Sequence, residues 1–140
     1  MTFEQNLSRK IRTRLTALNL TGVSVVVGND DDELTMPRIV VTATRGGVFV
    51  PGHAIYSVDI GIVIRANAWS AASSDKATTG NQSVEAIFAA VESSLTGDLT
   101  TLGDSTLAVY GAMYTGSVSD LREERTVERR WGFTMVAAPL

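Results

Sequence analysis

The chain has 140 residues, of which 44% are hydrophobic and 19% charged, and its formal net charge is −3. These values are typical of one globular domain, which we place over the whole of 1–140. The chain has no cysteine, which excludes disulfides, thiolate catalysis and cysteine-bound metals. Its net negative charge does not favour binding to nucleic acid, which is itself negatively charged.

Two further signals bear on location. No apolar run approaches the roughly 18 residues that a membrane-spanning helix needs. The first residues lack the basic-then-apolar order of a signal peptide. We therefore expect a protein that is made in the cytoplasm and has no membrane partner.

The first predicted element is an amphipathic helix. Thr2 and Gln5 fit a capping box, and Asn19 and Gly22 are suited to end the helix. Four cations and a single acid lie within the first fourteen residues, so the polar face is basic. We expect that face to be solvated, with contact to phosphates or an anionic partner as the alternative. The apolar positions, spaced by three or four, are Phe3, Leu7, Ile11, Leu15 and Leu18.

Three strands are predicted to follow. The stretch from Val23 to Val27 alternates between valine and smaller or polar residues, and Pro37 opens the next strand. The longest strand runs from around His53 to Ala66 and is apolar on one side only, which indicates a half-buried antiparallel strand. Its apolar side consists of Tyr56, Val58, Ile60, Ile62 and Ile64.

The second and third strands are predicted to form a long hairpin with an extended tip. Glycines at 46–47 precede Val48, Phe49 and Val50, and a proline and a glycine follow at 51–52. Turn residues thus bracket a short apolar run. If the tip is exposed it marks a contact with another molecule, and the alternative is that it folds back on its own sheet.

The second half of the chain is predicted to add a helix and two strands. Asp75 can cap the helix and Gly97 can end it. The element order is therefore α-β-β-β-α-β-β. For this order we expect an α+β fold, with a mainly antiparallel, mixed sheet of about five strands and both helices packed on one face. The apolar positions of the helix are Val84, Ile87, Phe88, Val91 and Leu95.

The fourth strand carries two tyrosines that we expect on its outer face. Leu107, Val109 and Met113 mark the core side by their spacing, which leaves Tyr110 and Tyr114 on the opposite side. Because interfaces are enriched in tyrosine, these two are candidates for a subunit contact. The alternative is that they only cover the solvent face of the sheet.

The entry to the final strand is densely charged. Seven of the nine residues from Arg122 to Arg130 are charged, on both faces of the strand, before Trp131 begins an apolar face. Buried unpaired charges are costly, so we expect this strand to begin outside the body of the domain and to enter it at Trp131. The resulting hypothesis is that the charged segment meets a neighbouring subunit or lines a channel.

No constellation for catalysis is found. A nucleophile needs a base beside it, and the only histidine, His53, lies about 13 and 20 Å along an extended strand from Ser57 and Asp59. The acidic run at 30–33 offers oxygen ligands for calcium or magnesium but lacks the glycine and glutamate of an EF-hand, so a solvated turn is favoured. We predict that the protein is not an enzyme and has no catalytic residue, no metal site and no cofactor.

In layout the chain resembles the tail terminator and tail completion proteins of long-tailed bacteriophages. The resemblance covers nearly the whole length. Its segments are the helix Phe3 to Leu18, Pro37-Arg-Ile-Val-Val, the strand Tyr56 to Arg65, the helix Val84 to Leu95, and the closing Glu128-Arg-Arg-Trp-Gly-Phe-Thr-Met-Val-Ala-Ala-Pro139.

This resemblance implies a small structural protein of the virion neck. Proteins of this family form hexameric rings that cap the tail tube, stop its polymerisation and meet the head connector. The expected partners are further copies of the chain, the tail tube protein and the head–tail connector, with DNA only passing through the lumen. The candidate interface residues are Arg45, Val48, Phe49, Val50, Tyr110, Tyr114, Arg122, Arg125, Glu128, Arg129 and Arg130.

Three alternatives stay open. The first is another neck or head-completion adaptor, because those proteins share the same general plan. The second is a monomeric binding module that uses the hairpin tip. The third is a small enzyme on a compact α+β fold, which the missing histidine and cysteine pairs disfavour.

Overall fold

The structure, a computed structural model, describes residues 2–20, 22–28, 37–67, 84–114, 116, 118–122 and 126–140, and at 67, 122 and 126 it describes the backbone alone. The acidic run at 30–33, the predicted cap Asp75 and the candidate Arg125 lie outside these residues.

Six strands form one mixed sheet in this part of the chain. Within the sheet β1 pairs with β2 in parallel, and β2–β3, β3–β6 and β4–β6 are antiparallel, in the order β1-β2-β3-β6-β4. β5 pairs with the start of β6, which β4 leaves free, so β4 and β5 are two pieces of one outer strand. This interruption explains why there are six strands where about five were predicted. In chain order they are β1 (Ser24–Val27), β2 (Arg38–Val48), β3 (Tyr56–Asn67), β4 (Leu107–Met113), β5 (Ser119–Arg122) and β6 (Thr126–Pro139).

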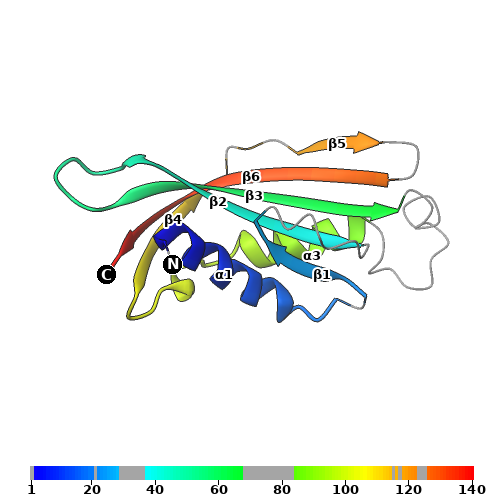
Figure 1. The fold of residues 1–140 in the computed structure, drawn as a ribbon, viewed down its shortest axis with the longest axis horizontal. Coiled ribbons are helices and arrows are strands. Elements are labelled where there is room, and N and C mark those ends of the chain that lie inside the picture. Colours follow the sequence, from blue (N-terminus) through cyan, green and yellow to red (C-terminus); the bar gives the residue numbers. More distant parts are fainter. Residues whose placement is uncertain are drawn as a thin grey trace.

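Both α-helices of the described residues lie on one face of the sheet, as predicted (Figure 1). α1 (Phe3–Thr16) begins with the expected capping box, in which the Thr2 hydroxyl accepts from the Gln5 amide at 3.2 Å and the Gln5 side chain accepts from the Thr2 amide at 3.0 Å. It packs against β1 and β2. α3 (Val84–Leu95) packs against β3 and β6, followed by a 3₁₀ turn, η3 (Thr100–Leu102). The α+β fold and its element order are therefore confirmed.

The core lies between the helices and the sheet. The apolar periodicity of each element predicts which residues enter it, because a helix buries every third or fourth residue and a strand every second one. The alternation of β3 is followed without a break. Its buried members are Val58, Ile60, Ile62, Ile64 and Ala66. They form one core with Leu7, Ile11, Leu15, Ile87, Val91 and Leu95 from the two helices.

The prediction that the last strand begins outside the domain is wrong. β6 is paired with β3 from its first residue, Thr126, and with β5 along its charged portion. Glu128 is only 5% exposed, although it lies three positions before Trp131, the predicted point of entry into the domain. The charges are tolerated there because they are paired within the chain, so the cost of an isolated buried charge does not arise.

The prediction that Tyr110 and Tyr114 share the outer face of the fourth strand is also wrong. A β-bulge at Tyr110 sets Val109 opposite Ala137 and Gly111 opposite Val136. The extra residue reverses the facing of everything after it. Tyr114 therefore turns toward the helices, and Met113, which was expected in the core, is exposed.

The long hairpin between β2 and β3 is present. β3 starts at Tyr56 and not near His53, and β6, not β3, is the longest strand of the described residues. A register shift between Arg45 and Val48 separates the regular ladder from the tip. The tip is closed by a hydrogen bond from the Phe49 amide to the Ile55 carbonyl at 2.6 Å. Gly52 turns it with a φ of 80°, which favours glycine.

Candidate interaction surfaces

The end of the β2–β3 hairpin, residues 44–55, forms an arm that projects beyond the rest of the domain (Figure 1). Val48 and Phe49 are each 51% exposed on it, whereas Val50 is half-buried. The alternative that the whole tip folds back on its own sheet therefore does not hold for Val48 and Phe49. An exposed aromatic and an exposed valine side by side favour a contact with another molecule.

The base of the arm is fixed to the domain by aromatic contacts. The guanidinium of Arg45 lies 4.9 Å from the centre of the Tyr56 ring, and that ring lies 6.0 Å from the ring of Phe3 at the start of α1. Gly46 is needed at this point, because a Cβ there would approach the Ser57 hydroxyl to 2.6 Å. The arm is thus held at its base while its apolar end stays exposed.

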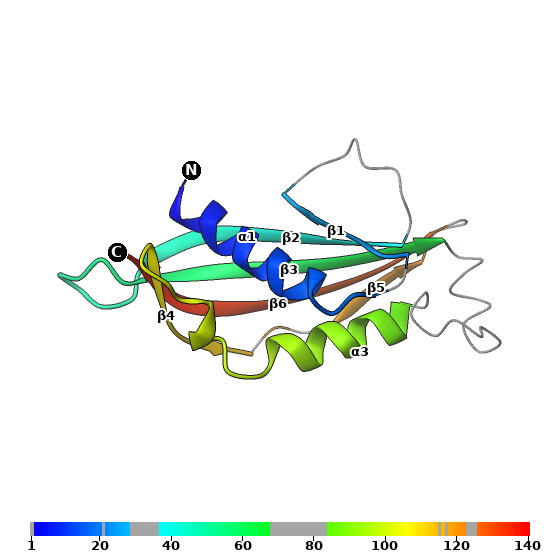
Figure 2. The ribbon, with the colours of Figure 1, turned by 90° about the horizontal axis from the view of Figure 1, so that it is seen from below.

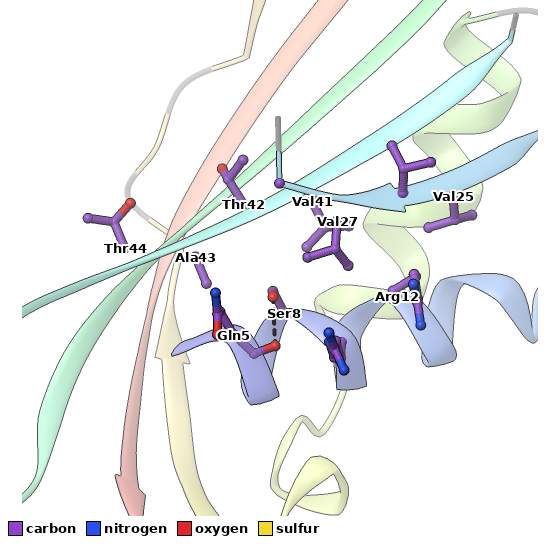
Figure 3. Close-up of a pocket in the computed structure, with 12 residues that line it drawn as sticks. Gln5, Ser8, Arg12, Val25, Val27, Val41, Thr42, Ala43 and Thr44 are labelled. Carbon is purple, nitrogen blue, oxygen red and sulfur yellow. Dashed lines mark hydrogen bonds between the residues drawn. The ribbon is translucent and has the colours of Figure 1, made fainter. Parts of the chain in front are cut away.

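A groove of about 570 Å³ separates α1 from the outer strands β1 and β2 (Figure 3). Its strand side carries Val25, Val27 and Ala43, and its helix side carries Arg9 and Arg12. Neither guanidinium forms a hydrogen bond or ion pair with any other described residue. The sequence pattern identified a basic helix face but not this groove, because the groove depends on how α1 crosses the strands.

The opposite edge of the sheet, made by β4, β5 and the residues between them, exposes a row of large apolar side chains. Tyr110 is 56% exposed, and the other members of the row are exposed to a similar or smaller degree. We call this row the apolar edge. Sequence reasoning singled out only its tyrosines, because the split of the outer strand leaves no regular alternation. Its members are Tyr110, Met113, Tyr114, Val118 and Leu121.

Tyr114 belongs partly to the core. Its ring lies 5.2 Å from the ring of Phe133 and is stacked on Trp131 at 6.3 Å, and its hydroxyl donates a hydrogen bond to the Leu95 carbonyl at the end of α3. Burial raises the pKa of this hydroxyl, and the positive charge of Arg14 acts against that rise. Tyr114 therefore joins α3 to the sheet, while Tyr110 has no such role among the described contacts.

Arg129 is held on the helix side of the sheet. It donates two hydrogen bonds to the Asp120 carboxylate on β5, at 2.7 and 2.9 Å, and lies 5.2 Å from the centre of the Phe88 ring. The hydrogen bond with Asp120 raises its pKa, and burial acts in the opposite direction. The charges of Glu85 and Glu92 on α3 favour the cation further.

Glu128 is held on the opposite face of the sheet, between two arginines. Its carboxylate accepts from Arg65 Nε and from Arg130 Nε, both at 2.5 Å. Burial pushes the pKa of Glu128 upward, but the hydrogen bonds from Arg65 and Arg130 and the charges of these two arginines together lower it overall. The assignment of Glu128, Arg129 and Arg130 to an interface stays a prediction, as it does for Arg122, whose side chain is not described.

Little in the described residues suggests catalysis. His53 is exposed at the hairpin turn, and no three or more histidine, aspartate or glutamate side chains gather where they could hold a metal ion in that part of the chain. None of the helices described there is long and apolar enough to cross a membrane. Comparison with protein-family models and with curated proteins found no match for this chain.

Proposed function

We propose that this chain is a structural protein of a bacteriophage neck, which forms a ring that terminates the tail tube and joins it to the head connector. The observation that carries the proposal is the projecting arm with Val48 and Phe49 half-exposed at its end. A monomer gains nothing from an arm of this kind, because exposed apolar surface lowers solubility without adding to the core. A partner that covers the arm gives it a role.

The resemblance to tail terminators directs the choice of partner. Ring assembly requires one patch on each subunit to meet a different patch on the next. The arm and the apolar edge supply two such patches, and they lie on different strands of the sheet. Further copies of the chain, the tail tube and the connector are the proposed partners, and the virion neck is the proposed location.

Mass in solution tests the proposal. Light scattering of the purified chain is expected to give about six times the chain mass of 14.9 kDa, and electron microscopy is expected to show closed rings. A mass of one or two chains at every concentration, with no rings in the images, would favour a monomeric binding module instead.

A variant of the arm tests the observation itself. Val48→Ser combined with Phe49→Ser removes the apolar end without touching the core, so circular dichroism and the unfolding midpoint are expected to stay unchanged. The ring is expected to be lost. The matched control is Leu140→Ser, which removes an exposed apolar side chain that belongs neither to the arm nor to the apolar edge. Rings that persist in the arm variant would contradict the role given to the arm.

A further inference from the structure

The two edges of the sheet carry helices of opposite charge. α1, beneath β1 and β2, holds four cations and one acid, a net charge of +3. α3, beneath β3 and β6, holds Glu85 and Glu92 and no cation, a net charge of −2. Figure 2 shows the two helices on different parts of the same face of the sheet. The helix under one part of the sheet is therefore basic, and the helix under the other part is acidic.

Only some of the cationic side chains of α1 have partners among the described residues. Lys10 is paired with Asp104, and Arg14 donates to the Asp98 carbonyl and to Thr101. Arg9 and Arg12 instead are exposed and line the groove beside β1, and their guanidinium groups have no hydrogen-bond or ion-pair partner among the described residues. Two guanidinium groups one helical turn apart are well placed to receive carboxylates from another molecule.

On the acidic side the exposed carboxylates face the β5 edge. Glu85 and Glu92 are seven residues apart on α3, so they lie on the same side of the helix, two turns from each other. Both act on the charge of Arg129, whose ion-pair partner Asp120 belongs to β5. Neither carboxylate forms a hydrogen bond or ion pair within the described part of the chain. Tyr114 of the apolar edge donates a hydrogen bond to the Leu95 carbonyl at the end of the same helix.

The groove and the apolar edge also match in polarity. The groove offers aliphatic side chains from β1 and β2 between its arginines and the open sheet edge. The apolar edge offers Tyr114, which is 40% exposed and is hydrogen-bonded to the end of the acidic helix. An apolar centre with charged residues at its margin is the usual composition of a protein interface.

We propose that the groove side of one copy, with Arg9 and Arg12, docks on the α3 and β4–β5 side of a second copy, with Glu85 and Glu92. The second copy is favoured as the occupant because a single chain carries both complementary charges. Groove against groove would set like charges together, so the contact is head to tail. In such a contact each copy uses one surface for each neighbour, so the contact can repeat around a closed ring. This inference rests on the proposed function and adds the two surfaces that meet.

Charge reversal on each side tests the contact. Arg9→Glu with Arg12→Glu makes both edges acidic, and Glu85→Lys with Glu92→Lys makes both basic. Each variant alone is expected to stay monomeric, with association weakened about tenfold or more at low salt. A one-to-one mixture is expected to reassemble, because each variant then meets an oppositely charged edge. A chain with all four substitutions is expected to assemble alone.

The control is Asp59→Lys, the same kind of charge reversal at a single exposed position on the sheet face away from the helices. It is expected to leave the mass in light scattering unchanged, and circular dichroism is expected to show that every variant folds. Assembly that survives both reversals, or a mixture that does not reassemble, would overturn this inference and leave the ring proposal standing.

Covalent cross-linking tests the contact even if the association is too weak to be seen in light scattering. The chain has no cysteine, so Arg12→Cys with Glu92→Cys creates the only two thiols. With a flexible bis-maleimide this variant is expected to give a ladder of covalent oligomers, while either single-cysteine variant stops at the dimer. A wild-type chain that stays monomeric, together with a double variant that gives no ladder, would overturn both the inference and the proposed function.

Discussion

The carboxylate of Glu128 on β6 accepts a hydrogen bond from Arg65 Nε on β3, directly across the strand pair, at 2.5 Å. Arg130 binds the second oxygen of the same carboxylate. The Glu128 side chain is almost fully covered, whereas both arginine side chains reach solvent. This cross-strand pair keeps the charged start of β6 inside the sheet.

Replacing Glu128 is therefore expected to destabilise the fold. Glu128→Gln leaves two guanidinium groups without their shared carboxylate, and we expect the free energy of unfolding to fall by about 1–3 kcal/mol. The matched control is Asp120→Asn, which weakens the more exposed pair with Arg129 and is expected to cost less than about 1 kcal/mol. Urea unfolding measures both, and equal losses would contradict the role given to Glu128.

The same carboxylate is expected to make the stability depend on pH. Its pKa is lower in the folded chain than in the unfolded chain, so its contribution is present above the unfolded value of about 4.3 and is lost as the pH falls through the folded value. Urea midpoints at a series of pH values measure this loss. In Glu128→Gln the acid dependence is expected to be shallower, and parallel curves for the two proteins would refute it.

The hydroxyl of Tyr114 is expected to stabilise the contact between α3 and the sheet. Tyr114→Phe keeps the ring on Trp131 but leaves the Leu95 carbonyl without its donor, so we expect a loss of about 0.5–1.5 kcal/mol. Tyr110→Phe is the matched control and is expected to change nothing, because Tyr110 is on the exposed side of the bulge. Thermal unfolding is expected to give a lower midpoint for Tyr114→Phe and an unchanged midpoint for Tyr110→Phe.

Close backbone packing explains a glycine between β4 and β5. A Cβ on Gly116 would stand 1.9 Å from the Gly132 carbonyl oxygen, so Gly116→Ala must displace the backbone of β6. We expect a cost of about 2 kcal/mol or more. Gly111→Ala, where a Cβ meets nothing within 4 Å, is expected to be tolerated. If calorimetry gives the two variants the same midpoint, this close approach does not limit the fold.

The elements that repeat regularly could be predicted from the sequence. The four-residue spacing of Leu7, Ile11 and Leu15 and the alternation of β3 follow directly from the geometry of helix and strand, and local periodicity is enough to find them. The hairpin arm was also visible, because turn residues bracket its apolar end. Its projection from the domain agrees with that reading.

The errors arose where a residue depends on a partner that is distant in the chain. Counting alternate residues fails after Tyr110, because a bulge is set by pairing with β6 and leaves no local signal. Glu128 was judged too costly to bury because its partner Arg65 is 63 positions away. The sequence shows that α3 carries two glutamates and no cation. It does not show where these glutamates lie relative to the apolar edge.

The sequence by itself determined the element order, the core faces of the helices and of β3, and the apolar end of the arm, since each depends on neighbours within a few residues. Only the tertiary structure decided which strand each charged residue meets, which way Tyr114 faces, and that the basic and acidic helices lie toward different edges of one sheet. Burial and pairing of charges are properties of contacts across the sheet, so periodicity along one strand cannot specify them.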